Sequence, residues 1–403
     1  MNIRRRSLLF VSIVALAISA QPINLHGQEP LDRKIIVLGE VQGAANTVAT
    51  FLEHLDLIDS EHHWTGSDTI LIQAGDLVDD GEHVRAALDL FMGLQDEAAA
   101  AGGEVIVLMG NHEALNILDE LRDVNPLAYQ SFAGPDSENR RRQVWEAWST
   151  WRTQRAEAVG ETFAADSEVE AEWYAAHPPG WVEYVESMGP EGVYGAWLRS
   201  LPVAVEINDI LFVHGGVNLE IEDRNVASIN RRAVEEIKSF DERKATMVAD
   251  GLCLQTSSAD DMVNVINQEA AYLNSLDDSE RTTSNPRVAQ LLEIYDLSLW
   301  KSWSVLDAKG PLCFHGLARW PEEDHGAEVT AILEAFDIDR IITGQGDGIN
   351  RLIQARFDNR ILLTAVDMTD DPEGHGDEPA ALEIVGGDYF VATMGGRELL
   401  IDN

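Results

Sequence analysis

Short apolar runs alternate with segments of helical spacing over the first third of the chain. Residues 34–38, 69–73 and 104–109 are mainly apolar runs followed by turns, and residues 44–57 and 83–101 between them have a helical pattern. Runs that are apolar at successive positions are typical of strands covered on both faces. Alternation of such strands with helices of this length predicts βαβ units and a largely parallel sheet.

A long stretch of different character follows these strands. Residues 114–200 are acidic, rich in Trp and helical in pattern, which predicts a helical insertion that caps the sheet. Strand patterns return later, and the last two of them are expected to be closing edge strands: 210–213, 341–342, 360–366, 382–385 and 389–392. Residues 226–285 have little strand character and are expected to form helices and a surface loop. We therefore expect one α/β domain over residues 31–403 that contains the helical insertion.

The N-terminus has the layout of a secretory signal peptide. Residues 4–6 are arginines, residues 8–18 are apolar and uncharged, and the small residues Ser19 and Ala20 follow. The apolar run is shorter than an ordinary membrane span. We expect residues 1–20 to be removed on export and the mature protein to be periplasmic or secreted. An uncleaved anchor is the alternative, and the paired arginines leave open whether export is Sec-dependent or twin-arginine-dependent.

Composition limits the partners and the redox chemistry. The chain has 70 acidic and 29 basic residues and a net charge of -41, so its surface repels nucleic acid and anionic lipid. We therefore expect no nucleic-acid partner, and no membrane partner after signal cleavage. The acid excess fits a protein exposed to high salt, and a compositional bias toward Arg over Lys explains it equally well. Cys253 and Cys313 are the only cysteines, and their spacing does not decide whether they pair.

Polar residues gather in four glycine-containing turns that follow predicted strands: Gly39–Gly43, Gly75–Gly81, Gly110–Glu113 and His214–Gly216. Ligands of open α/β sheets bind at the edge where strands end. Glycine permits a tight turn there and a close approach of the backbone. Carboxylate, amide and imidazole groups from neighbouring turns suit divalent metal ions. The pattern predicts a metal site at this edge.

The order of these turns resembles the signatures of the calcineurin-like metallophosphoesterase superfamily, which run GDxHG, GDxVDRG, GNHE, HGG and GHT. Within that superfamily the chain is similar to the Shewanella-like protein phosphatases in several stretches: 177–180, 194–202, 214–216, 310–312 and 356–358. The resemblance covers roughly residues 33–368. It implies a metallophosphoesterase-type β-sandwich flanked by helices, a centre of two divalent ions (Mn, Fe or Zn), and a phosphorylated small molecule or phosphoprotein as substrate.

The resemblance also implies roles for particular residues. By position, Asp76 corresponds to an aspartate that bridges the two ions, and Asn111 and His214 correspond to ligands of one ion. Asn111 corresponds in addition to a phosphate contact. His112 corresponds to the general acid that protonates the leaving group, and Asp79 to the carboxylate that orients it. Two ions can bind phosphate oxygens and activate a water, and an imidazolium held by a carboxylate can supply the proton.

Five positions around this site depart from the family pattern. Glu40 and Gln42 stand where the first turn has an aspartate and a histidine, and Gln345 stands where the GHT turn has its histidine. Glu40 can still bind metal, but its extra methylene moves the carboxylate by roughly an ångström. Gln42 and Gln345 remain candidate metal ligands by position, but each offers only a neutral carbonyl oxygen in place of imidazole. Asp80 and His315 stand where the family has two phosphate-binding arginines. Asp80 places a negative charge near the phosphate, and His315 offers the phosphate a positive charge only when its imidazole is protonated.

These residues leave two functions open. The lost ligands and arginines favour a metallophosphoesterase with a degraded two-metal site and weak or no phosphatase activity, in which the helical cap has a binding role. The retained pair of His112 and Asp79 favours the alternative, an active metal-dependent phosphoric-ester hydrolase with an altered centre and His112 as general acid. We expect one ion or none in place of two, and whether the chain is an enzyme stays open at this point.

Overall fold

The strands of the computed structural model form two sheets. The structure describes residues 33–402 except 159, 223, 347–352, 367, 369 and 371–377, so the expected signal peptide (residues 1–20) lies outside the described residues. The first sheet has the order β11-β10-β9-β1-β2-β3 and contains six strands: β1 (Ile35–Leu38), β2 (Ile70–Gln73), β3 (Glu104–Val107), β9 (Ala380–Val385), β10 (Asp388–Thr393) and β11 (Gly396–Ile401). The second has the order β4-β5-β6-β8-β7 and contains five: β4 (Ala204–Ile207), β5 (Ile210–Val213), β6 (Arg340–Thr343), β7 (Gln354–Arg356) and β8 (Ile361–Leu363).

The two sheets pack face to face. On β1, Ile35 and Val37 belong to an inner core shared with Phe212 of β5, whereas the alternate residues Ile36 and Leu38 belong to the outer core beneath the helices. Because successive side chains of a strand point to opposite faces, a strand with both faces covered is apolar throughout. This arrangement is the expected β-sandwich flanked by helices.

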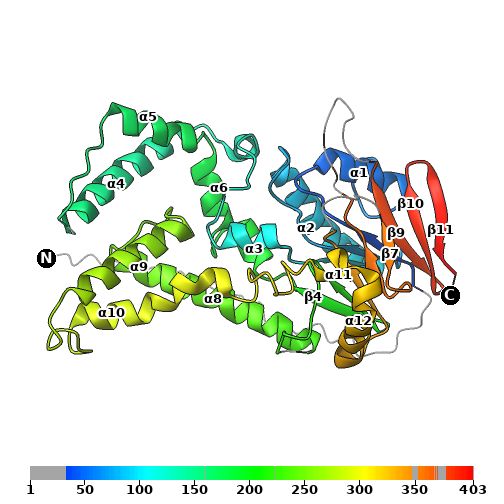
Figure 1. The fold of residues 1–403 in the computed structure, drawn as a ribbon. Helices are drawn as coiled ribbons and strands as arrows, with labels where there is room; N and C mark the ends of the chain where they lie inside the picture. Colours follow the sequence, from blue (N-terminus) through cyan, green and yellow to red (C-terminus); the bar gives the residue numbers. More distant parts are fainter. Residues whose placement is uncertain are drawn as a thin grey trace, which may run out of the picture.

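Helices cover the outer faces of the sandwich (Figure 1). The helices that lie beside the sheets are α1 (Ala45–His54), α2 (Val84–Ala101), α11 (Gly316–Arg319) and α12 (Glu322–Phe336). The buried faces of α1 and α2 include Phe51 and Phe91, both fully buried in the outer core. The two helices expected at residues 44–57 and 83–101 are therefore confirmed.

The sheets are mixed rather than largely parallel. Parallel pairs join β1 to β2, β2 to β3, β5 to β6 and β6 to β8, and the other pairs are antiparallel. Helices separate β1, β2 and β3 in the chain, as expected, whereas the pairs β4–β5, β7–β8, β9–β10 and β10–β11 are joined by short turns and are antiparallel. The C-terminal strand β9 also adds to β1 in the antiparallel direction. Between β4 and β5, Asn208 and Asp209 have φ of 54° and 58°, which is the backbone of a two-residue hairpin turn. The prediction of a largely parallel sheet was wrong for this reason.

Three strands have no strong sequence signal: β4, β7 and β11. β7 has only three residues and all are half-buried, and β11 is mostly exposed at the edge of its sheet. Edge strands need little apolar surface because one side has no neighbour and one face meets solvent. The other strands occur where the apolar runs predicted them.

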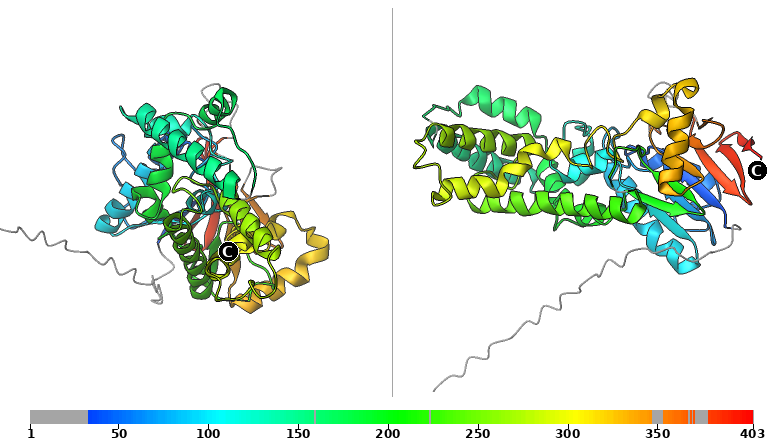
Figure 2. Two further views of the ribbon diagram at one scale, coloured as in Figure 1. Left: turned by 90° about the vertical axis from the view of Figure 1, so that its left-hand side faces the viewer. Right: turned by 60° about the horizontal axis from the view of Figure 1, so that its bottom comes forward.

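Two helical segments lie together at one end of the molecule. The expected insertion contains α3 (Asn111–Ile117), η1 (Ala128–Phe132), α4 (Ser137–Ala158), α5 (Ser167–Ala176), α6 (Trp181–Met188) and α7 (Val193–Leu198). The second segment contains α8 (Val226–Ala249), α9 (Ala259–Asn274), α10 (Pro286–Ile294) and η2 (Tyr295–Ser302). Figure 1 shows α4, α5, α9 and α10 at the end opposite β9–β11, and the second view of Figure 2 shows the helices extending lengthwise from the sheets. None of the helices in the described ranges is both long and apolar enough to cross a membrane.

Side chains fasten the two helical segments to each other. Arg155 of α4 donates to the buried carboxylate of Glu269 on α9 at 2.9 Å, and Arg287 of α10 pairs with the same carboxylate. Within the first segment, Trp145 and Trp181 both pack against Trp173, with ring centroids 5.6 and 6.1 Å apart. The Trp residues therefore pack in a core, and the cap is built from both segments.

Candidate functional site

Polar side chains from four turns meet where β1, β2, β3 and β5 end. The parallel strands of each sheet place their carboxyl ends at one edge, and the sandwich brings the two edges together. The backbone of Gly75 approaches His214 so closely that a Cβ there would lie 2.6 Å from His214 Nδ1. A Cβ on Gly110 would lie 2.2 Å from Asp76 Oδ1. Glycine is therefore required at both turns for the side chains to converge.

Glu40, Asp76 and His214 form a cluster of possible metal ligands. One ligand atom from each lies within 4.8 Å of the others. Asp76 Oδ2 and Asn111 Oδ1 lie 3.1 and 2.9 Å from His214 Nε2. Asp76 and His214 are buried, with 2% and 0% of their surface exposed, and Asp76 has a left-handed backbone with φ of 56°. Residues are kept in such a backbone where the surrounding structure demands it.

The ring of His214 presents a nitrogen to this cluster. Its Nδ1 lies 2.8 Å from the carbonyl oxygen of Ala74, so Nδ1 carries a proton and donates it. Its Nε2 then faces the oxygens of Asp76 and Asn111, an arrangement that suits either an imidazolium or a cation held between these groups. Burial opposes protonation of His214, but the Asp76 carboxylate outweighs burial and raises the pKa of His214 to about 9. Burial likewise opposes ionisation of Asp76, and His214 nevertheless keeps the pKa of Asp76 below its ordinary value.

The donor chemistry fits a divalent cation. Carboxylate oxygens of Glu40 and Asp76, an imidazole nitrogen of His214 and the amide oxygen of Asn111 are ligands that Mn, Fe and Zn accept. The backbone carbonyl of Ala74 orients the imidazole, as hydrogen-bond partners behind metal ligands commonly do.

His112 and Asp79 form a buried pair beside this cluster. His112 Nδ1 lies 2.6 Å from Asp79 Oδ2, and its Nε2 lies 3.8 Å from Asp76 Oδ2. Asn116 donates to the other oxygen of Asp79 at 2.6 Å, and Tyr184 of α6 donates to Asn116 at 2.6 Å. Burial lowers the pKa of His112, but the hydrogen bond to Asp79 and the charge of Asp76 raise it overall to about 10. His112 is therefore protonated at neutral pH.

Sequence reasoning missed Asn116 and Tyr184. Asn116 lies four residues after His112 on α3, so the helical spacing places both on one face. That spacing is the available signal for Asn116. Tyr184 comes from α6, and only the packing of the helical segment against the sheets brings its hydroxyl to Asn116.

Glu113 was also overlooked, although it lies within the third turn. It is fully buried, and its carboxylate accepts hydrogen bonds from the backbone N–H groups of Gly110, Asp76, Leu77 and Val78 at 2.8, 2.8, 2.7 and 3.2 Å. Burial raises its pKa to about 7. The carboxylate ties the turn after β3 to the turn after β2. A Glu three residues after the N-cap of α3 is the sequence signal for such a contact.

In the substituted first turn, Glu40 belongs to the cluster of possible metal ligands, and Gln42 contacts Glu40. Gln42 Nε2 donates to Glu40 Oε2 at 3.3 Å. The Gln42 amide therefore helps to orient the Glu40 carboxylate, and Glu40 is the member of this turn that joins Asp76 and His214. The expectation that Gln42 is itself a ligand has no support in the described contacts.

The other substituted residues occupy different environments. Gln345 lies behind His214, because its backbone N–H donates to the His214 carbonyl at 2.9 Å, and its own Oε1 is buried without a hydrogen-bond partner among the described residues. His315 Nδ1 is likewise buried without a partner there, and burial lowers the pKa of His315. Asp80 is exposed, so solvent screens its charge.

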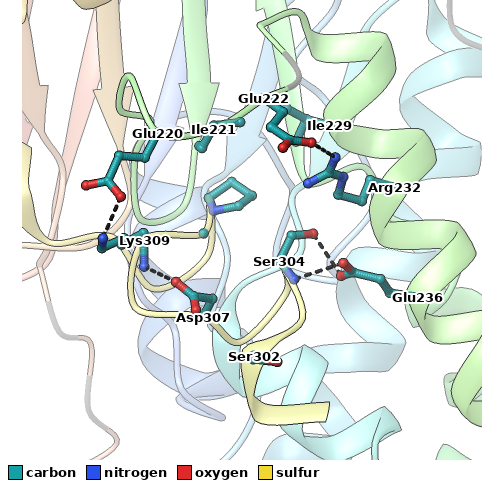
Figure 3. A pocket seen from close by; sticks show the side chains of 12 residues that line it. Glu220, Ile221, Glu222, Ile229, Arg232, Glu236, Ser302, Ser304, Asp307 and Lys309 are labelled. Atoms are coloured by element: carbon teal, nitrogen blue, oxygen red, sulfur yellow. Dashed lines mark hydrogen bonds and ion pairs between the residues drawn. The ribbon is translucent and has the colours of Figure 1, made fainter. Parts of the chain in front are cut away.

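A cavity of about 240 Å³ lies near this edge but contains none of the predicted site residues. Figure 3 shows Glu220 paired with Lys309 on one side and Glu222 paired with Arg232 on the other. The other two carboxylates of the cavity, Glu236 and Asp307, accept hydrogen bonds from Ser304 and from the backbone N–H of Lys309 (Figure 3). On its wall, the carbonyl of Pro311 accepts the N–H groups of the glycines that follow His214, at 3.0 and 3.1 Å, so this loop supports the turn from behind.

Comparisons with known proteins agree with this fold and site. A family model for calcineurin-like phosphoesterases matches residues 33–300. The chain belongs to that family. Calcineurin-like phosphoesterases use divalent metals, in line with the ligands gathered here.

Two curated relatives of this phosphoesterase are Shewanella-like phosphatases. Shewanella-like protein phosphatase 1 of Plasmodium berghei (strain Anka) is 27% identical over 206 residues, which cover 51% of this chain and 45% of the relative. Shewanella-like protein phosphatase 2 of Arabidopsis thaliana is 23% identical over 219 residues, 51% of this chain and 52% of the relative. The chain thus spans about half the length of these relatives.

Solved structures support the fold of the phosphoesterase. A point mutant of a cold-active protein tyrosine phosphatase aligns with a TM-score of 0.56 and 19% identity, covering 92% of this chain and 81% of that chain. The cold-active protein-tyrosine phosphatase of a psychrophilic Shewanella species aligns with a TM-score of 0.51 and 18% identity, with coverage of 92% and 81%. At these identities the likeness shows the sandwich and its helices.

Proposed function

We propose that this calcineurin-like phosphoesterase is a weak, metal-dependent phosphoric-ester hydrolase that uses one ion in place of two. The observation that carries the proposal is the cluster of Glu40, Asp76 and His214 within 4.8 Å, next to the His112–Asp79 pair at 2.6 Å. Candidate metal ligands and a candidate proton donor are thus adjacent at one sheet edge. The substrate is a phosphorylated small molecule or a phosphoprotein.

Glu40, Asp76, Asn111 and His214 would hold the ion. A bound divalent ion polarises a phosphoryl oxygen and lowers the pKa of a bound water. Glu40 supports the one-ion centre, because its longer side chain reaches the cluster formed by Asp76 and His214.

His112 supplies the proton for the leaving group. The hydrogen bond from His112 Nδ1 to Asp79 raises the pKa of His112, so His112 Nε2 carries a proton at neutral pH. This Nε2 lies 3.8 Å from Asp76 Oδ2. Asn116 and Tyr184 hold the Asp79 carboxylate in place. A group positioned and protonated in this way is a general acid.

Weak turnover follows from the groups that this chain lacks. Gln42 hydrogen-bonds to Glu40 rather than adding an imidazole, and Gln345 has an amide where the family has a histidine. Neither Asp80 nor His315 provides the permanent positive charge of an arginine. Transition-state charge on the phosphoryl group is therefore stabilised less than in a two-ion site with two arginines.

The test is the metal content of the purified protein and its turnover of 4-nitrophenyl phosphate with added Mn²⁺. We expect one ion per chain and slow turnover that falls by about 10²–10⁴-fold in His112→Ala. His62→Ala, which removes an exposed histidine, is the matched control and leaves turnover unchanged. Failure to bind metal, or turnover that His112→Ala does not reduce, contradicts the proposal and favours a non-catalytic protein with a binding role.

We also propose that the protein is exported and that residues 1–20 are removed. The basic start and short apolar run of that segment support this. N-terminal sequencing of protein recovered from the periplasm or medium tests it. An intact N-terminus on protein found inside the cell contradicts it.

A further inference from the structure

The side chain of Arg319 has no hydrogen-bond, ion-pair or ring partner in the part of the chain that the structure describes. It is exposed at the end of α11, and it makes none of the hydrogen bonds, ion pairs and ring contacts that the other described arginine side chains make. Such isolation is unusual in a chain with 70 acidic and 29 basic residues, where carboxylates are available nearly everywhere.

Arg319 lies one helical turn beyond His315, the residue that replaces an arginine of the family pattern. The backbone N–H of Arg319 donates to the His315 carbonyl at 3.0 Å. Residues four positions apart lie on the same face of a helix. A guanidinium at position 319 can therefore reach toward the space that a guanidinium at position 315 would approach.

This face of α11 adjoins the metal cluster. His315 hydrogen-bonds to the backbone at Gly346, next to Gln345, and it experiences the charges of Arg319, His214 and Asp76. The described residues leave two buried polar atoms without partners here, namely His315 Nδ1 and Gln345 Oε1. Orphaned buried atoms are rare and commonly mark the place of a ligand or water. His315 and Gln345 thus lie beside the cluster, and His315 is at the start of the short helix that ends with Arg319.

We propose that Arg319 binds the phosphoryl oxygens of the substrate, in place of the arginine that His315 has replaced. An arginine offers a fork of N–H donors that matches phosphate geometry and keeps its charge at every physiological pH. An exposed and unpaired arginine also breaks no internal ion pair when it binds substrate. The inference rests on the proposed hydrolase function, because it assigns a residue of the same site.

The experiment measures the affinity of Mn²⁺-loaded protein for inorganic phosphate by calorimetry, and the KM and kcat for 4-nitrophenyl phosphate. We expect Arg319→Gln to weaken phosphate binding roughly tenfold or more and to raise KM, because a charge-assisted hydrogen bond is lost. Arg319→Lys retains part of the affinity. Arg281→Gln, on the helical segment remote from the strand ends, removes the same charge and leaves affinity unchanged. Metal content is equal in all variants, because Arg319 donates no ligand to the ion.

A double variant tests whether positions 315 and 319 serve the same space. Adding His315→Arg to Arg319→Gln is expected to restore phosphate affinity. Wild-type affinity in Arg319→Gln, or an equal loss in Arg281→Gln, overturns the inference, while metal uptake and turnover in the same proteins leave the hydrolase function standing. Conversely, protein that takes up no metal but still loses phosphate binding in Arg319→Gln supports Arg319 and contradicts the hydrolase function.

Discussion

His112 Nδ1 lies 2.6 Å from a carboxylate oxygen of Asp79, which is only 1% exposed, and the pair is intact although neighbouring ligand positions have changed. The contact belongs to a series of hydrogen bonds, because Asn116 donates to Asp79 and Tyr184 donates to Asn116. An imidazolium with three supporting residues is more than a buried remnant requires. This series of hydrogen bonds holds His112 in the position required of the proposed general acid.

The pair makes the stability of the metal-free protein depend on pH. Pairing raises the pKa of His112 from 6.5 to about 10, so the stabilisation is fully present below pH 6.5 and is lost as the pH rises through about 10. We expect the free energy of unfolding, measured with urea and a chelator, to fall between pH 6 and pH 10, and to fall less in Asp79→Asn. Other titrating groups contribute to both proteins, so the difference isolates the pair. Equal pH dependence in the two proteins contradicts this prediction.

Restoring the lost ligands should restore the second ion. In a variant that combines Glu40→Asp, Gln42→His and Gln345→His, an imidazole replaces the amide at two positions and the shorter carboxylate returns at the third. We expect two Mn²⁺ per chain by elemental analysis, against one in the wild type, and faster turnover of 4-nitrophenyl phosphate. The matched control is Asp68→Asn with His62→Gln, which changes exposed residues of similar chemistry elsewhere. A metal content that stays at one ion would show that the surrounding backbone, and not only the side chains, has changed.

The four turns could be predicted because each combines a glycine with polar residues directly after an apolar strand. Glu40, Asp76, Asn111 and His214 accordingly meet as expected. Groups supplied by distant packing could not be predicted. Tyr184 reaches the site only through the position of α6, and the antiparallel edge strands follow from turn geometry that a hydrophobic pattern does not encode.

Arg319 illustrates a second limit of the sequence. Alignment to the family pattern directs attention to His315, where an arginine is missing, and says nothing of a replacement one helical turn later. Arg319 stands out because its side chain has no hydrogen-bond, ion-pair or ring partner among the described residues, whereas most other described arginines bind carboxylates or carbonyl groups. Sequence alone does not show which cation in an acidic protein remains unpaired.

Glu113 is expected to be essential for stability. Its carboxylate accepts four backbone N–H groups from two turns, all buried. Glu113→Ala leaves these donors without partners, at a cost of roughly 3–5 kcal/mol in the free energy of unfolding. Urea unfolding of the metal-free protein measures the change. Glu398→Ala, at an exposed position of β11, is the control and changes the free energy by less than about 0.5 kcal/mol.

The two cysteines are unpaired, and burial raises the pKa of each thiol to about 12. Alkylation requires the thiolate, so Cys253 and Cys313 should both resist iodoacetamide in the native protein at pH 8. Cys313 is less buried than Cys253 and should react first as the pH is raised. Mass spectrometry of protein treated with iodoacetamide, with and without urea, is expected to show no label on the native chain and two labels on the unfolded chain. Labelling of the native protein within minutes at pH 8 would contradict the burial of the thiols. Absence of label in urea without a reductant would instead mean that the cysteines form a disulfide, which the structure does not contain.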